Sequence, residues 1–84
     1  DALINANAWE MPVVFKKLQE WGNVPWHEMY RTFNMGIGMV LVVAAGEADA
    51  VRAHLQANNE TFYELGSVVK GSGQAIVKGG VFGD

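Results

Sequence analysis

The stretch Glu28–Val43, EMYRTFNMGIGMVLVV, places hydrogen-bonding side chains directly before two glycines and a long apolar run. An arginine offers a planar fork of five donors, a threonine adds a hydroxyl group, and an asparagine can both donate and accept. The two glycines would let a ligand approach the backbone closely. Together these residues could hold a polar anion. The candidate ligand-binding residues are Arg31, Thr32, Asn34, Gly36 and Gly38.

The same residues also have a purely structural interpretation. Arg31 can pair with Glu28, three positions earlier on a helical face, which is worth only about 0.2–0.5 kcal/mol at a surface. Asn34 can take a left-handed conformation at a helix end, and the glycines can clear space for Trp21 or Phe33. From the residues alone, both interpretations stay open.

Three apparent motifs fail for chemical reasons. HEMYR at 27–31 begins like the zinc motif H-E-x-x-H, but Arg31 stands where the second ligand is needed. GIG at 36–38 precedes the expected strand, so no helix N-terminus follows it to face a pyrophosphate. Gly66 and Gly71 have the spacing of the two glycines in a phosphate-binding loop, but Ser72 stands where that loop requires lysine.

The two histidines, His27 and His54, lie far apart in the sequence. We interpret them as exposed or hydrogen-bonded side chains rather than catalytic ones. The sequence therefore assigns no catalytic residue and no metal ligand.

Composition limits the class of protein. The chain has 84 residues, half of them apolar, so it should fold as a single domain or as part of one. A formal charge of −3 with scattered lysines and arginines gives no footprint for nucleic acid or an anionic membrane. Cysteine is absent, and no apolar stretch reaches the roughly 18 residues of a spanning helix, which together favour a cytoplasmic protein.

Patterning predicts three helices and three strands. The expected helices cover residues 12–21, a short segment after Pro25, and a segment starting at Glu47 and ending at the two asparagines 58–59. The expected strands are a central one in GMVLVVAA (38–45) and a closing hairpin of TFYELGSVVK (61–70) and QAIVK (74–78). The glycine-rich tail at 79–84 is expected to be frayed.

These elements define an α+β fold, with helices packed on a mixed or antiparallel sheet in the order α-α-β-α-β-β. Six of the nine aromatic residues lie within 9–33, more than two short helices under a small sheet can bury. We infer from this a partner surface that other polypeptide covers.

The segment MPVVFKKLQEWGNVPWHEMYRTFNMGIGMVLVV, and above all its block EMYRTFNMGIGM, resembles the carboxy-terminal domain of the phosphoribosylformylglycinamidine cyclo-ligase family, also called aminoimidazole ribonucleotide synthetases. The resemblance runs from about Trp9 through the final pair of strands. Members often carry cysteine where Met35 stands, which argues against an essential thiol at that position.

The resemblance implies a role in de novo purine synthesis, where an ATP-dependent ring closure converts formylglycinamidine ribonucleotide to aminoimidazole ribonucleotide. It implies that ATP and magnesium bind mainly to an amino-terminal domain, which also builds a homodimer and packs against this domain. The nucleotide substrate would lie in the cleft between the domains, facing residues 31–38, with Arg31 near its phosphate. The chain alone would then be inactive. The alternative is a stand-alone α+β module that binds a small ligand or regulates another protein, and calorimetry on the 84 residues would detect such binding.

Overall fold

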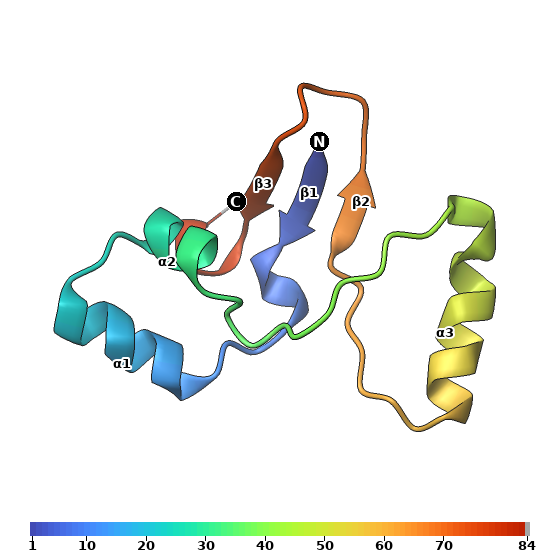
Figure 1. The fold of residues 1–84 in the computed structure, drawn as a ribbon, viewed down its shortest axis with the longest axis horizontal. Coiled ribbons are helices and arrows are strands. Elements are labelled where there is room, and N and C mark those ends of the chain that lie inside the picture. Colours follow the sequence, from blue (N-terminus) through green and yellow to red (C-terminus); the bar gives the residue numbers. More distant parts are fainter. Residues whose placement is uncertain (84) are drawn as a thin grey trace.

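A computed structural model describes residues 1–83 as a small mixed sheet with helices on either side of it (Figure 1). The sheet contains β1 (Ala2–Asn5), β2 (Gly66–Val68) and β3 (Ala75–Lys78) in the spatial order β2-β1-β3. Strand β1 runs antiparallel to β2 and parallel to β3. The expected α+β class with a mixed sheet is confirmed.

The three expected helices are present as α1 (Val13–Gly22), α2 (Trp26–Thr32) and α3 (Ala48–Ala57). Pro12 and Pro25 stand immediately before α1 and α2, where a missing N–H group costs nothing. Helix α1 ends at Gly22, and the left-handed backbone of Asn23 (φ 49°) lets the next N–H, of Val24, donate to the Gln19 carbonyl at 3.2 Å. Short 3₁₀ turns occupy Ala6–Ala8, Ala45–Glu47 and Gly80–Phe82.

The expectation of a central strand at 38–45 is wrong. Residues 37–44 are irregular, and their apolar side chains face solvent, with Met39 81 % and Val42 75 % exposed. A strand needs a hydrogen-bonding neighbour, and within residues 1–83 none pairs with this segment. The central strand is β1, so the observed order β-α-α-α-β-β differs from the expected one in the position of a single strand.

The expected hairpin is also wrong, although both of its strands exist. β2 and β3 do not pair with each other, because β1 lies between them, with Leu3 opposite Ser67 on one side and Ile76 on the other. The connection 69–74 therefore arches over the start of β1 (Figure 1). Asp1 supports this arch, since its Oδ1 accepts from the N–H groups of Ser72 (2.8 Å) and Gln74 (2.9 Å).

The buried core is very small. Ala6, Met29 and Met35 are the buried apolar residues of the described chain, whereas many large apolar side chains are exposed. The radius of gyration is 14.3 Å, compared with about 12 Å for a compact domain of this length. No helix within residues 1–83 is both long and apolar enough to cross a membrane.

Part of the glycine-rich tail is folded against α2. The 3₁₀ turn Gly80–Phe82 brings the Phe82 ring to 5.1 Å from the Tyr30 ring, measured between centroids. Fraying of 79–84 in solution stays a prediction, and its last residue lies outside the described part of the chain.

Candidate functional site

Arg31 lies at the surface in the last turn of α2, with its side chain 81 % exposed. Its Nη1 is 3.7 Å from Glu28 Oε1, so the pairing expected from the three-residue spacing is confirmed. The same carboxylate oxygen is 3.6 Å from His27 Nε2. At this exposure and distance the ion pair holds the guanidinium only loosely, and most of its donors remain accessible.

Arg31 opens onto a pocket of about 350 Å³ between α2 and β3. The side chains and backbone that line it come from α2, β3 and the final 3₁₀ turn, and they are His27, Tyr30, Arg31, Ala75, Val77 and Phe82. Burial raises the pKa of the Tyr30 hydroxyl above its ordinary value, so this group is a neutral donor and acceptor at physiological pH. A cation at the edge of an apolar pocket suits a ligand that combines an anionic group with a flat or apolar part.

The loop that follows α2 is shaped by two side chains. Asn34 Oδ1 accepts a hydrogen bond from the N–H of Gly36 at 2.9 Å, and the Trp9 indole N–H donates to the Met35 carbonyl at 3.0 Å. Met35, and not Asn34, takes the left-handed conformation (φ 54°). The amide oxygen of Asn34 therefore supports the loop itself, and its NH₂ group is the part that could serve a ligand.

The two glycines differ in their surroundings. Gly36 has φ 99°, and a Cβ added there would lie 2.6 Å from Pro12 Cδ. Any side chain at this position would therefore clash with the proline ring. The group that needs this space is Pro12, rather than Trp21 or Phe33. A Cβ at Gly38 would meet no atom within 4 Å, so a ligand could approach that backbone from outside.

The structure thus brings only part of the candidate set to one pocket. Arg31 lines the pocket described above, whereas Thr32, Asn34, Gly36 and Gly38 are not among its lining residues. His27 and Tyr30 are lining residues that the sequence analysis did not select. The available signal was the position of His27, three residues before Tyr30 and four before Arg31 on the same helix.

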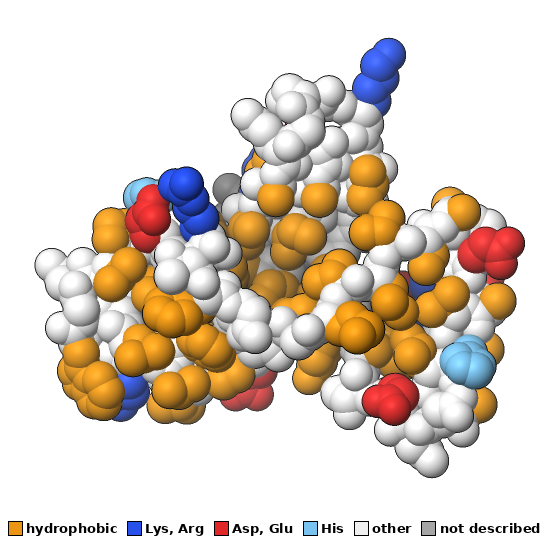
Figure 2. All heavy atoms as spheres, in the orientation of Figure 1, with side chains coloured by type: hydrophobic (Ala, Val, Ile, Leu, Met, Phe, Trp, Pro, Cys, Tyr) orange, Lys and Arg blue, Asp and Glu red, His pale blue; other side chains and the backbone are white. Residues whose placement is uncertain are grey.

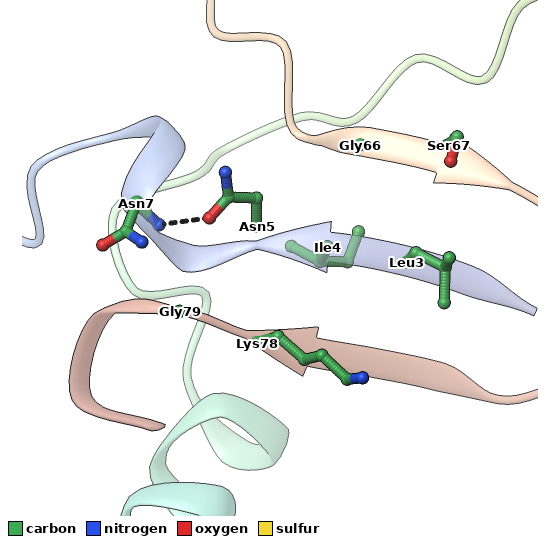
Figure 3. Close-up of a pocket in the computed structure, with 8 residues that line it drawn as sticks. All are labelled: Leu3, Ile4, Asn5, Asn7, Gly66, Ser67, Lys78 and Gly79. Atoms are coloured by element: carbon green, nitrogen blue, oxygen red, sulfur yellow. Dashed lines mark hydrogen bonds between the residues drawn. The ribbon is translucent and has the colours of Figure 1, made fainter. Parts of the chain in front are cut away.

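A second pocket, of about 430 Å³, lies at the ends of the three strands (Figure 3). Two asparagines organise it, because Asn5 Oδ1 accepts from the N–H of Asn7 and Asn7 Oδ1 accepts from the N–H of Gly80, both at 2.9 Å. These bonds direct both amide oxygens to the backbone. None of its lining residues was among the candidate ligand-binding residues predicted from the sequence. Among residues 1–83, no cluster of three or more His, Cys, Asp or Glu side chains could hold a metal ion.

Comparison with known proteins defines the class. Residues 2–79 match the family described as "AIR synthase related protein, C-terminal domain". Because this match covers nearly the whole chain, the chain belongs to that family, and the resemblance inferred from EMYRTFNMGIGM is confirmed.

Individual relatives share the name of one enzyme. The phosphoribosylformylglycinamidine cyclo-ligase of Neisseria gonorrhoeae is 57 % identical over 67 residues, which cover 80 % of this chain and 20 % of that protein. The cyclo-ligase of Neisseria meningitidis serogroup C is 55 % identical over a stretch of the same length and coverage. The chain therefore spans about one fifth of the length of these relatives.

Proposed function

We propose that this chain is part of a phosphoribosylformylglycinamidine cyclo-ligase, which acts in de novo purine synthesis. The observation that carries the proposal is the family match over residues 2–79, together with 57 % identity to a protein of that name. In the proposed reaction, formylglycinamidine ribonucleotide and ATP give aminoimidazole ribonucleotide, ADP and phosphate.

The reaction has a clear chemical requirement. A formyl oxygen is a poor leaving group until ATP phosphorylates it, after which an amidine nitrogen of the same molecule attacks the activated carbon and the oxygen leaves as phosphate. We propose that ATP and magnesium bind mainly to the amino-terminal domain of the full-length enzyme. The contribution of this chain would be to bind and orient the nucleotide substrate.

In this proposal the substrate's phosphate lies at the exposed fork of Arg31. The accessibility of that guanidinium and the pocket beside it support the assignment. The part of the cleft next to the pocket would be lined by Thr32, the NH₂ group of Asn34 and the open backbone at Gly38. Gly36 would allow the loop to turn.

The proposed partners are the amino-terminal domain of the same enzyme and, through that domain, a second subunit in a cytoplasmic homodimer. The exposed segment Met39–Val43 supports the first of these, because five successive apolar side chains form a surface that another strand or domain can cover. On this view the isolated chain binds no ATP and has no turnover.

Substitution of Arg31 in the full-length enzyme tests the site. Arg31→Ala should lower kcat/KM by about 10- to 100-fold through KM, because it removes charge-assisted hydrogen bonds to the substrate's phosphate. Lys16→Ala, which removes an exposed cation from α1, is the matched control and should leave steady-state kinetics unchanged. Equal kinetics for both variants would contradict the assignment of Arg31.

A further inference from the structure

The two pockets lie on opposite faces of the sheet, because side chains alternate along each strand. Asn5 and Lys78 are directly opposite each other in β1 and β3, and both line the second pocket described above, the strand-end pocket. The neighbouring Val77 points to the other face and lines the Arg31 pocket. Figure 2 shows hydrophobic side chains gathered over the strands on one face of the sheet. The strand-end pocket has several polar side chains and shares no lining residue with the Arg31 pocket, so a ligand in it does not need Arg31.

The strand-end pocket presents hydrogen-bond donors of fixed orientation. The amide oxygen of Asn5 accepts from the N–H of Asn7, and the amide oxygen of Asn7 accepts from the N–H of Gly80. Each amide therefore leaves its NH₂ group as a donor, and neither NH₂ group has an acceptor within residues 1–83. Both amides lie next to Gly79, since a Cβ added there would be 2.7 Å from Asn7 Nδ2 and 2.8 Å from Asn5 Oδ1. Two oriented donors are thus close together at one end of the pocket.

The charge of the strand-end pocket favours an anion. Lys78 adds an ammonium group and Ser67 a hydroxyl group, and Figure 3 shows the lysine side chain extending along β3 beside β1. Within residues 1–83, Lys78 takes part in no ion pair and no carboxylate lines the pocket. The whole chain has a formal charge of −3, so a pocket with one cation and no acid differs in sign from the rest of the molecule.

We propose that the strand-end pocket binds the carboxylate group of a small aliphatic molecule. The NH₂ groups of Asn5 and Asn7 donate to the carboxylate oxygens, and the Lys78 ammonium group supplies the opposite charge. The volume of about 430 Å³ is that of a small-molecule pocket, and Leu3 contributes hydrocarbon to its wall. A carboxylate with a short apolar chain uses both features, whereas free phosphate uses only the donors. This site does not depend on the reaction proposed above.

Acylation of lysines in the intact protein tests the site directly. Butyrate is added until its effect is constant, at an ionic strength kept equal with sodium chloride, and the rate of acetylation by an N-hydroxysuccinimide ester is followed by peptide mass spectrometry. Butyrate should slow the acetylation of Lys78 by about fivefold, because the bound carboxylate covers the amine. Lys70, which is exposed on the arch between β2 and β3, is the control within the same chain and should react at an unchanged rate.

Inorganic phosphate at the same ionic strength provides the comparison of ligand class. It should protect Lys78 less than butyrate does, because it has no apolar part to place against Leu3. Equal slowing of Lys78 and Lys70, no slowing of Lys78, or stronger protection by phosphate than by butyrate would overturn the proposal.

An isosteric substitution tests the role of the amides. In Asn7→Asp a carboxylate oxygen still accepts from the N–H of Gly80, but a negatively charged oxygen replaces the NH₂ donor. The butyrate concentration that gives half of the protection of Lys78 should rise by about tenfold or more. Asn59→Asp adds the same charge at an exposed position after α3 and should leave this concentration unchanged.

Arg31→Ala separates this site from the proposed substrate site. It should leave the protection of Lys78 by butyrate unchanged, whether or not it alters turnover, because Arg31 lines only the other pocket. Protection that is lost in Arg31→Ala, or that is unaffected in Asn7→Asp, would refute binding in the strand-end pocket.

Discussion

The conformation of the loop that follows α2 is held by hydrogen bonds and close contacts of single residues. Met35 is 1 % exposed and takes a left-handed backbone that non-glycine residues rarely adopt. Its carbonyl accepts from the Trp9 indole, and the next residue, Gly36, donates to Asn34. The candidate ligand-binding loop is thus held by side chains that do not themselves face a ligand.

The two glycines of this loop should respond differently to the same substitution. Gly36→Ala should lower the free energy of unfolding by about 1–3 kcal/mol, because the new Cβ overlaps the Pro12 ring and the backbone conformation (φ 99°) is unfavourable for alanine. Gly38→Ala is the control and should change it by less than about 0.5 kcal/mol, since the space around it is open. Urea unfolding of the intact protein measures both values. Equal losses would show that the loop is not held against Pro12.

The indole hydrogen bond gives a second prediction for a single residue. Trp9→Phe keeps an aromatic ring beside Tyr30 but removes the donor to the Met35 carbonyl, and should cost about 0.5–1.5 kcal/mol of stability. Trp21→Phe removes an indole that is 78 % exposed, and should be close to neutral in the same urea titration. A neutral Trp9→Phe would mean that water replaces the indole at this carbonyl.

Helix α3 stands apart from α1 and α2, on the opposite side of the sheet (Figure 1). Arg52 connects it to the segment before β2, through a 2.6 Å contact from Nη1 to Glu64 Oε1 and a second one from Nη2 to Asp49. The hydrogen bond with Asp49, followed by the charge of Glu64, raises the pKa of the Arg52 guanidinium. Because the folded-state pKa is raised, this contribution is fully present below arginine's ordinary pKa and is lost only at higher pH.

Removal of this cation should loosen α3 without unfolding the sheet. In Arg52→Met, amide hydrogen exchange within Ala48–Ala57 should become faster, while exchange in β1 stays the same. High salt should produce a smaller change in the same direction, because exposed ion pairs are screened. Lys70→Met, on the arch between β2 and β3, is the control and should leave α3 unchanged. Faster exchange throughout the molecule would show that α3 and the sheet unfold together.

The sequence predicted the helices well and the sheet poorly, for a physical reason. Helices are specified by local signals, such as Pro12 before α1 and Pro25 before α2. Pairing of strands depends on residues far apart, so neither β1 nor its position between β2 and β3 could be read from local pattern. The apolar run 38–45 has the composition of a strand, but hydrogen bonding requires a neighbour, and none is present within residues 1–83. At the site, Arg31 was predictable by its chemistry, whereas the pocket beside it depends on Phe82, more than 50 positions away.

At the scale of the whole molecule, the small core and the large exposed apolar surface are typical of one part of a larger fold. Three buried apolar residues cannot offset the conformational entropy of more than 80 ordered ones. The exposed apolar surface is spread over α1, the segment 39–43 and the sheet. Most of the stabilising burial must therefore come from polypeptide that covers these surfaces.

The exposed apolar surface predicts strong binding of a hydrophobic dye. The isolated chain should enhance the fluorescence of anilinonaphthalene sulfonate several-fold more than the same molar amount of full-length enzyme, because in the proposed enzyme the amino-terminal domain covers Met39–Val43, which is exposed in this chain. Replacing Leu41 and Val42 by serine should reduce the dye signal of the isolated chain and so narrow its difference from the full-length enzyme. Equal dye binding by chain and enzyme would contradict coverage of this segment.

The position of β1 between two later strands also has a consequence for synthesis on the ribosome. Its partners, which pair Ala2 with Val68 and with Ala75, are translated roughly 70 residues after it. The nascent chain must therefore keep β1 without these two partners until residues 66–78 have left the exit tunnel. A ribosome that stalls before Gln74 would release a product whose innermost strand has one open edge, which makes it a substrate for chaperones and proteases.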